Sequence, residues 1–539
     1  MHLTAVIRIA RWVGWLALAG SAGVVFGTVL VEAIRGPVAG QSMWPSPRLW
    51  RLFFTSVGLG TAATGVALVL ALPPAIALLS ARRTLQRSIL LAIVVLPLVS
   101  MPSSFAYAWM LLATSRIEWI ARAMTLVGWN VPGRQIAQAA WVIATWLWPI
   151  PCLVLVTSFR HGGRAAHQLA SLDSSPIRAF VHGALPVMRA PLLAAIAVVF
   201  ILAVTDSTIP PLMNATQVWG VEMLAQASVA SHYDRPTAYI FWQARPMVVV
   251  VGLLAALAVP GLRQMASWVA EPDLGETGGL VPASRWTWGS ATALGMLTTV
   301  LPICVFCIEL ANGRTTAMAS FATAYRTLAD AGAATLVVAV SVGALAVCIA
   351  LALLFERGGA RSRAAIGGRI GLLLLVGTAL MPPEVTGTSL VSFFSRICNP
   401  ATWNVYDNTP WTWIAAMIGR FGFLPVGVAW LLNKRVPADI IAAAASDGAS
   451  DMQRFVHARL PGLWRGMITA AMMAACLTVS EVAVSVLVQP PQFFGGSLAV
   501  AIDSQMHYGR QNETIASAVL LMIPAVMFAV LGPMALRRR

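Results

Sequence analysis

The sequence predicts an all-α membrane protein with about twelve membrane-spanning helices, arranged as two parallel six-span repeats. Three observations predict this class: the composition, the length of the apolar runs and a motif that occurs twice. Of the 539 residues, 58% are hydrophobic and only 10% are charged. A soluble domain has roughly a quarter charged residues, so a soluble, disordered or coiled-coil chain is excluded.

Apolar runs of about 20 residues are long enough to cross the bilayer as helices. The first run follows Arg8 and Arg11 like a signal peptide, but it is too long and contains Glu32, so we expect it to be an uncleaved first span. The expected spans are residues 12–34, 53–79, 88–113, 138–158, 190–212, 240–262, 287–310, 331–355, 370–394, 410–432, 467–489 and 514–536.

The distribution of basic residues predicts the orientation of these spans. If the N-terminus is cytoplasmic, most of the 36 basic residues fall on cytoplasmic segments, including three at the C-terminal end. This positive-inside asymmetry predicts that both termini are cytoplasmic. The net charge of +16 is therefore a topology signal, and it does not indicate a nucleic-acid partner.

The chain has no phosphate-binding loop of its own. Lys434 is its only lysine and no glycine-rich turn precedes it, so the lysine-containing ATP-binding motif is absent. No catalytic motif of a membrane protease occurs, and no metal-ligand pattern or cofactor is indicated. We expect a protein that is not an enzyme.

A motif of seven residues recurs in the second part of the chain. Phe180-Val181-His182 and Leu185-Pro186 match Phe455-Val456-His457 and Leu460-Pro461, 275 positions later. The same offset pairs Asp206 with Glu481 and Ser175 with Ser450. Six spans separate the copies, so they have the same orientation in the membrane. The expected parts are a first half, 1–262, a cytoplasmic linker, 263–286, and a second half, 287–539.

In each half the long cytoplasmic loop precedes the fifth span, at about 160–189 and about 434–465. In the second loop we expect a small-residue helix that ends at Gly448, then a second helix with a capping box from Ser450 to Gln453. In the first loop Ser175 is the matching cap, and Pro176 takes the first helical position.

These loops resemble the E-A-A-x-x-x-G-x9-I-x-L-P pattern of permease subunits of binding-protein-dependent ABC importers. In the second copy alanine stands where the pattern has its glutamate, and the first copy has lost the glutamate, both alanines and the glycine. The resemblance implies coupling helices that dock on a separate ABC ATPase subunit, itself a dimer. The residues on which it rests are Ala442, Ala443, Ala444, Gly448, Leu460 and Pro461, with Ala170, Asp173, Leu185 and Pro186 in the first copy.

The fused two-half arrangement resembles permeases for iron(III), and also those for thiamine and some phosphonates. The segment from Ser480-Glu481 through Pro490-Pro491 to His507-Tyr508-Gly509 is similar to the iron(III) type. The resemblance implies a bacterial inner-membrane protein that receives cargo from a periplasmic binding protein. A secondary transporter of two six-span halves is the rival class, and it would need an ion gradient in place of the ATPase.

Charged residues within apolar runs are expensive, so they usually face a cavity or a partner. Asp206, Glu481, Glu384 and Arg420 are therefore candidates for the translocation path, and Arg245 is a further one. Asp206 and Glu481 could equally cap helix ends or pair with arginines. His232-Tyr233 and His507-Tyr508 are expected on outer loops, either for docking or for local packing.

Overall fold

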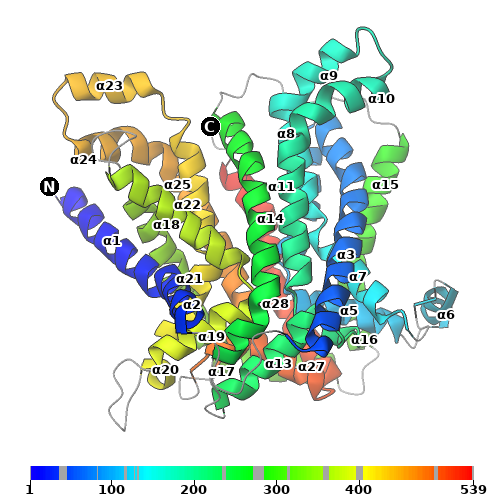
Figure 1. Ribbon diagram of the computed structural model, residues 1–539. Helices are drawn as coiled ribbons and strands as arrows, with labels where there is room; N and C mark the ends of the chain where they lie inside the picture. The colour runs from blue at the N-terminus through cyan, green and yellow to red at the C-terminus, as the bar shows by residue number, and fades with distance from the viewer. Residues whose placement is uncertain are drawn as a thin grey trace.

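The computed structural model consists of helices, with no strand among the residues that it describes (Figure 1). Long helices of the bundle run between an upper and a lower end, as Figure 1 is drawn. The description excludes residues 1, 36–44, 82, 115–117, 127, 130–132, 233–237, 271–284, 312–315, 356–362, 396–404, 491–495 and 537–539.

In its described residues, the first part of the chain contains fourteen α-helices and three π-helical turns. They are α1 (His2–Leu18), η1 (Ala19–Gly23), α2 (Val24–Arg35), α3 (Pro47–Ser80), α4 (Thr84–Val99), α5 (Pro102–Ala113), α6 (Glu118–Leu126), α7 (Gln135–Leu147), α8 (Pro149–Ser158), η2 (Phe159–Gly163), α9 (Arg164–Ala170), α10 (Pro176–Ala179), η3 (Phe180–Ala184), α11 (Leu185–Val204), α12 (Ile209–Leu212), α13 (Trp219–His232) and α14 (Ala238–Ala270).

The second part follows a similar order. Its elements are α15 (Arg285–Gly295), η4 (Met296–Val300), α16 (Leu301–Ala311), α17 (Ala317–Leu354), α18 (Arg363–Leu380), α19 (Pro383–Phe394), α20 (Val405–Asn408), α21 (Trp411–Phe421), α22 (Phe423–Asn433), α23 (Ala438–Ser446), α24 (Asp451–Arg454), η5 (Phe455–Arg459), α25 (Leu460–Ser480), α26 (Ser485–Val488), α27 (Leu498–His507) and α28 (Gln511–Leu536).

Several of these helices are long and apolar enough to cross a membrane, which agrees with the predicted all-α membrane protein. Within the described ranges six single helices meet this condition, or ten if each of four bent pairs forms one span. The remaining predicted runs, 287–310 and 514–536, lie in α15–α16 and α28. Their passage through the membrane stays a prediction.

Two predicted spans are sharply bent at prolines that interrupt their apolar runs. The run 88–113 divides into α4 and α5 at 93°, and the run 370–394 divides into α18 and α19 at 113°. Pro102 and Pro383 begin the second helix of each pair. Proline lacks a backbone N–H, so the preceding helix cannot continue through it with full hydrogen bonding. The two other bent pairs, α7–α8 and α21–α22, differ by 42° and 41°.

Equivalent hydrogen bonds and turns occur in the two parts. The Ser56 hydroxyl on α3 accepts the Trp219 N–H at the start of α13, at 2.7 Å, and the Thr335 hydroxyl on α17 accepts the Leu498 N–H at the start of α27, at 2.9 Å. The π turns η3 and η5 begin at Phe180 and Phe455, at the 275-residue offset. Local geometry therefore follows the 275-residue repeat at the π turns, whereas the two hydroxyl contacts are related by an offset of 279 positions.

Each part of the chain packs its first helix against the other part. Helix α1 lies along α17, and α15 lies along α3. The approach of α1 to α17 is close, because a Cβ on Gly14 would lie 2.2 Å from the carbonyl oxygen of Cys348. The two main apolar cores likewise combine residues from both parts. Helix α14 also continues to Ala270, beyond the predicted start of the linker, and 271–284 lies outside the described residues.

Candidate functional site

Two helical loops project from the same end of the bundle. Helices α9 and α10 lie at the upper right of Figure 1, and α23 and α24 lie at the upper left, while α13, α20 and α27 lie at the opposite end. This places the two loops with the coupling motif on one side of the protein. The N-terminus lies toward the same end as these loops (Figure 1).

The second loop has the local structure that its sequence predicts. Helix α23 contains Ala442, Ala443 and Ala444 and ends in a turn at Gly448, whose φ is +76°. The Ala449 N–H donates to the Ala444 carbonyl at 3.0 Å, which is the closing bond of a Schellman turn. The Ser450 capping box is present, with Ser450 N–H bonded to the Gln453 side chain at 2.8 Å.

Helix α9 of the first loop packs closely against the π turn η3 of the same loop. Helix α9 ends at Ala170, exposed Asp173 follows in the turn, and α10 begins at Pro176 as predicted. A Cβ on Gly183 would lie 2.7 Å from the Ala166 carbonyl oxygen, so only glycine permits this approach of α9 to η3. Neither α9 nor α23 buries a residue of its own.

Both loops expose apolar side chains toward solvent. Leu169 and Leu172 in the first loop are 69% and 79% exposed, and Ile440 on α23 is 52% exposed. Leu185 and Leu460 begin α11 and α25, with Pro186 and Pro461 in the first turn of each. The loop continues through its π turn into the long helix without a break, which the sequence interpretation of two separate helices had not anticipated.

Asp206 and Glu481 each cap a short helix that follows a long one. The Asp206 carboxylate accepts the backbone N–H groups of Thr208 at 3.0 Å and Ile209 at 3.3 Å, before α12. The Glu481 carboxylate accepts the Val484 N–H at 3.3 Å, before α26. Of the two interpretations left open by the sequence, capping is therefore present at both positions, and the long helices end at Val204 and Ser480 rather than at 212 and 489.

Glu384 is the fully buried carboxylate of this region. It lies in the first turn of α19, directly after the 113° bend, and none of its surface is exposed. The Ser207 side chain lies beside it, but neither carboxylate oxygen has a partner at hydrogen-bond geometry among the described residues. A buried polar group without such a partner costs about 1 to 3 kcal/mol, so its retention needs an explanation.

Arg420 holds the bend between α18 and α19. Its Nη1 donates to the carbonyl oxygens of Ala379 and Met381, both at 3.2 Å. In a continuous helix the Ala379 carbonyl would accept the N–H of residue 383, and proline has none. The guanidinium replaces the missing donor, so Arg420 has a structural role at the bend.

The four predicted path residues lie in one electrostatic neighbourhood. Asp206 interacts electrostatically with Glu481 and Arg420, and Glu384 interacts with Asp206 and Arg420. We call this group the central polar cluster. It consists of Asp206, Ser207, Glu384, Arg420 and Glu481. It joins the first part of the chain to the second. In the part of the chain that the structure describes, no three His, Cys, Asp or Glu side chains are placed to hold a metal ion.

The other candidates have local contacts. Arg245 on α14 donates to the Trp242 carbonyl at 2.8 Å and stacks on the Trp242 ring. His507 lies 3.5 Å from Asp503 on α27, and Tyr508 is 81% exposed. Burial raises the pKa of Asp503, and the nearby His507 acts in the opposite direction. The side chain of His232 and the whole of Tyr233 lie outside the described residues.

Sequence reasoning missed Ser207, Ser56 and Thr335. Ser207 directly follows Asp206, which the 275-residue repeat identified. The contact of Ser207 with Glu384 could not be predicted, because Glu384 lies on a helix that is distant in sequence. Ser56 and Thr335 accept N–H groups 163 positions further along the chain. No local pattern predicts such a contact.

No known protein family matches this chain, and neither a characterised protein nor a solved structure matches it.

Proposed function

We propose that the protein is the membrane-spanning permease subunit of an ATP-driven importer, with twelve spans in two parallel six-span repeats. ATP hydrolysis belongs to a separate ABC ATPase dimer, and cargo comes from an external binding protein. The observation that carries the proposal is the pair of exposed helical loops at one end of the bundle, each followed by a π turn and a Leu-Pro step into a long helix.

This arrangement can transmit a movement from the loops to the central polar cluster. Residues Asp451–Ser480 form one continuous helix of 30 residues, and Glu481 follows it directly. The corresponding helix Phe180–Val204 ends two residues before Asp206. Because a helix is stiff along its axis, with a rise of about 1.5 Å per residue, displacement of either loop by the ATPase would move a capping carboxylate of the cluster.

The matched geometry of the two parts supports the six-span repeat. The bent pairs occur in the same order, with sharp bends of 93° and 113° and shallow bends of 42° and 41°. The exchanged first helices, α1 on α17 and α15 on α3, are what a twofold arrangement of two similar halves requires. By the positive-inside asymmetry the loop end is cytoplasmic. The resemblance to permeases of binding-protein-dependent importers implies that the membrane is a bacterial inner membrane.

The proposed cargo is iron(III), from the resemblance of the segment 480–509, with thiamine and phosphonates as alternatives. A trivalent metal ion prefers several oxygen donors, and the described residues place no three such groups together. The central polar cluster would therefore contact cargo through Glu384, whose carboxylate is the one not used for capping.

Transport by purified components tests the proposal. Proteoliposomes with the full chain are supplied with an ABC ATPase and a binding protein, and the uptake of iron(III), thiamine and a phosphonate is measured with and without ATP. ATP-dependent uptake that needs the ATPase supports the importer. Uptake driven by an ion gradient without the ATPase would refute it in favour of a secondary transporter.

A further inference from the structure

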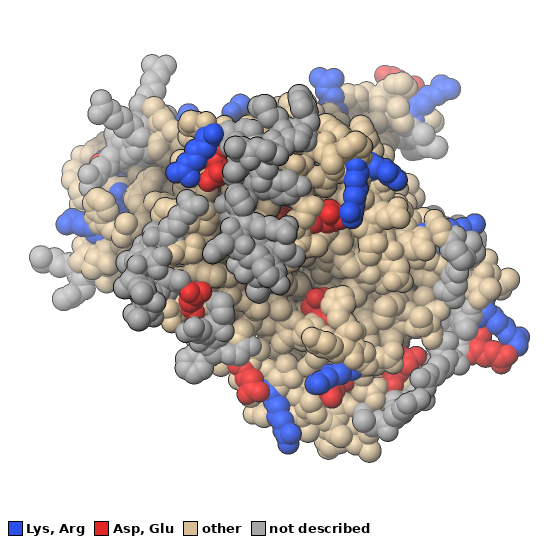
Figure 2. All heavy atoms as spheres, turned by 60° about the horizontal axis from the view of Figure 1, so that its bottom comes forward, with Lys and Arg blue, Asp and Glu red and all other residues tan. Residues whose placement is uncertain are grey.

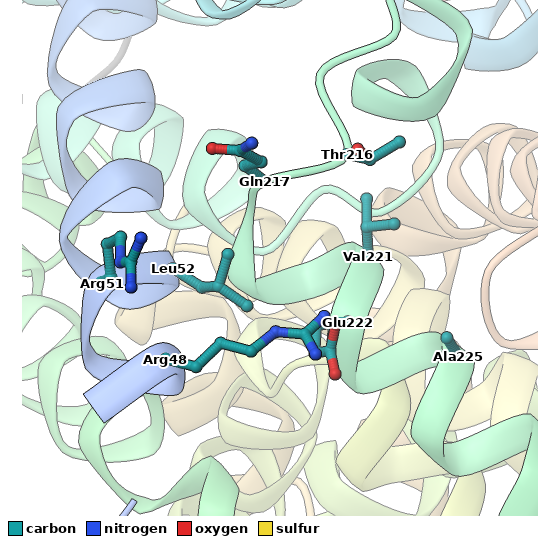
Figure 3. Close-up of a pocket in the computed structure, with 8 residues that line it drawn as sticks. All are labelled: Arg48, Arg51, Leu52, Thr216, Gln217, Val221, Glu222 and Ala225. Carbon is teal, nitrogen blue, oxygen red and sulfur yellow. Dashed lines mark hydrogen bonds and ion pairs between the residues drawn. The ribbon is translucent and has the colours of Figure 1, made fainter. Parts of the chain in front are cut away.

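A pocket of about 450 Å³ lies between the start of α3 and the start of α13 (Figure 3). It is at the end of the bundle opposite to the helical loops, near α13 and α27 in Figure 1. Figure 2, which turns this end forward, shows acidic and basic side chains in scattered small groups on a mainly uncharged surface. The polar side chains that line the pocket are Arg48, Arg51, Thr216, Gln217 and Glu222.

The acid in this pocket has one hydrogen-bond donor on each carboxylate oxygen. Arg48 Nη2 donates to Glu222 Oε2 at 2.7 Å, and Gln226 Nε2 donates to Glu222 Oε1 at 2.9 Å. The ion pair fixes the Arg48 guanidinium against the pocket wall, as Figure 3 shows. A guanidinium has five N–H donors, so Arg48 retains donors for another acceptor.

Arg51 supplies a second guanidinium whose charge is not balanced. Its side chain is drawn on the α3 side of the pocket in Figure 3, and no ion pair of Arg51 occurs among the described residues. Two arginines against one glutamate leave the pocket with an excess positive charge. The exposed Thr216 hydroxyl and Gln217 amide are further donors on the opposite side.

The pocket is specific to the first part of the chain. Ser56 on α3 and Thr335 on α17 make equivalent contacts, so the two helices align at an offset of 279 positions. At this offset Thr327 corresponds to Arg48, and Asp330 corresponds to Arg51. Thr327 there accepts a hydrogen bond from Gln505 at 3.2 Å, and Asp330 is exposed. An acid at this position would repel an anion.

We propose that this pocket binds a phosphate group, held by Arg51 and the remaining donors of Arg48. Guanidinium forks match the geometry of phosphate oxygens and form charge-assisted hydrogen bonds with them. Trp50 and Phe54, which stack at 6.0 Å on the same two turns of α3, place the pocket at the depth of an aromatic belt. Lipid headgroups and free phosphate therefore both have access, and the proposal does not depend on the transport function.

Binding of inorganic phosphate to the full-length protein in phosphatidylcholine nanodiscs tests this, by isothermal titration calorimetry. We expect saturable binding that Arg51→Gln weakens about tenfold or more. Glu222→Gln should strengthen binding, because it removes the competing carboxylate. Arg326→Gln is the matched control, since Arg326 is an exposed arginine near the start of α17, outside the pocket, and it should leave the affinity unchanged.

A second set of nanodiscs with phosphatidylglycerol identifies the source of the phosphate. If a lipid headgroup occupies the pocket, these discs weaken the binding of inorganic phosphate to the wild type, whereas equal affinity in both discs assigns the pocket to a soluble anion. The proposal is overturned if the wild type shows no saturable binding, or if Arg51→Gln and Arg326→Gln weaken it equally.

Discussion

At the scale of single residues, most charged groups of the central polar cluster have a local structural role. Asp206 and Glu481 cap α12 and α26, and Arg420 replaces the N–H that Pro383 lacks. Glu384 is different, because its carboxylate is buried without a hydrogen-bond partner among the described residues. A fully buried carboxylate that caps no helix is the strongest candidate in the cluster for a contact with cargo.

Glu384→Gln should therefore stabilise the fold and at the same time reduce transport. Removal of a carboxylate buried in this way should raise the free energy of unfolding by about 1 to 3 kcal/mol, while ATP-dependent uptake should fall. Thermal unfolding in detergent and uptake into proteoliposomes measure the two effects. Normal uptake by a well-folded Glu384→Gln variant would remove this residue from the proposed path.

Arg420→Met should destabilise the protein, because it leaves the carbonyls of Ala379 and Met381 without a donor at the bend. Loss of these bonds should lower the free energy of unfolding by about 2 to 4 kcal/mol. Arg245→Met is the matched control, since Arg245 donates to a carbonyl of its own helix, and its loss should be smaller. Equal destabilisation by the two variants would contradict the structural role of Arg420 at the bend.

At the scale of elements, the sequence predicts what local chemistry determines. The Ser450 capping box, the helix start at Pro176 and the turn at Gly448 are all confirmed, because each depends on neighbours in the chain. Pro102 and Pro383 interrupt predicted spans, so a kink was expected at each, but the size of the bends, 93° and 113°, was not predicted. Prolines also lie within helices, as Pro73 and Pro74 do in α3, so a proline alone does not distinguish a break from a tolerated kink.

The membership of the central polar cluster could be predicted only in part. Its four charged residues were identified because charges are rare in apolar runs. Which of them cap a helix depends on where α11 and α25 end, and the apolar runs continue past both ends. The proximity of Ser207 to Glu384 depends on contact between distant helices, which a single sequence does not encode locally.

The two helical loops should contribute unequally to coupling. Gly448→Trp places a side chain at a φ of +76°, which disfavours the turn at the end of α23, and it should abolish ATP-dependent uptake. Asp173→Trp changes an exposed residue in the first loop and should be milder. ATPase co-purification and uptake measure both. Equal loss from the two variants would mean that the first loop couples as strongly as the second.

At the scale of the whole molecule, the loops, the cluster and the phosphate pocket lie in different places along the bundle. The loops are at one end, and α13, whose first turns line the pocket, is at the other (Figure 1). If the loop end is cytoplasmic, reporter tags inserted within 271–284 and at the C-terminus should both report the cytoplasm. An external signal from either tag would contradict the two-half topology.

The exchange of first helices makes a prediction about assembly. Helix α1 packs on α17 and α15 packs on α3, so each half expressed alone lacks the helix that covers its second span. The fragments 1–277 and 278–539 should therefore be protease-sensitive when produced separately, because each exposes a helix face that is buried in the full chain.

Produced together, the same two fragments should assemble into a protease-resistant complex, since the cut falls within the predicted linker and leaves every described helix intact. Gly14→Leu in the first fragment provides the control. Its side chain would meet the backbone of α17, where a Cβ alone already lies 2.2 Å from the Cys348 carbonyl oxygen, so it should prevent assembly. If the second fragment, which lacks α1, is protease-resistant alone, or if Gly14→Leu assembles normally, α1 does not hold the two halves together.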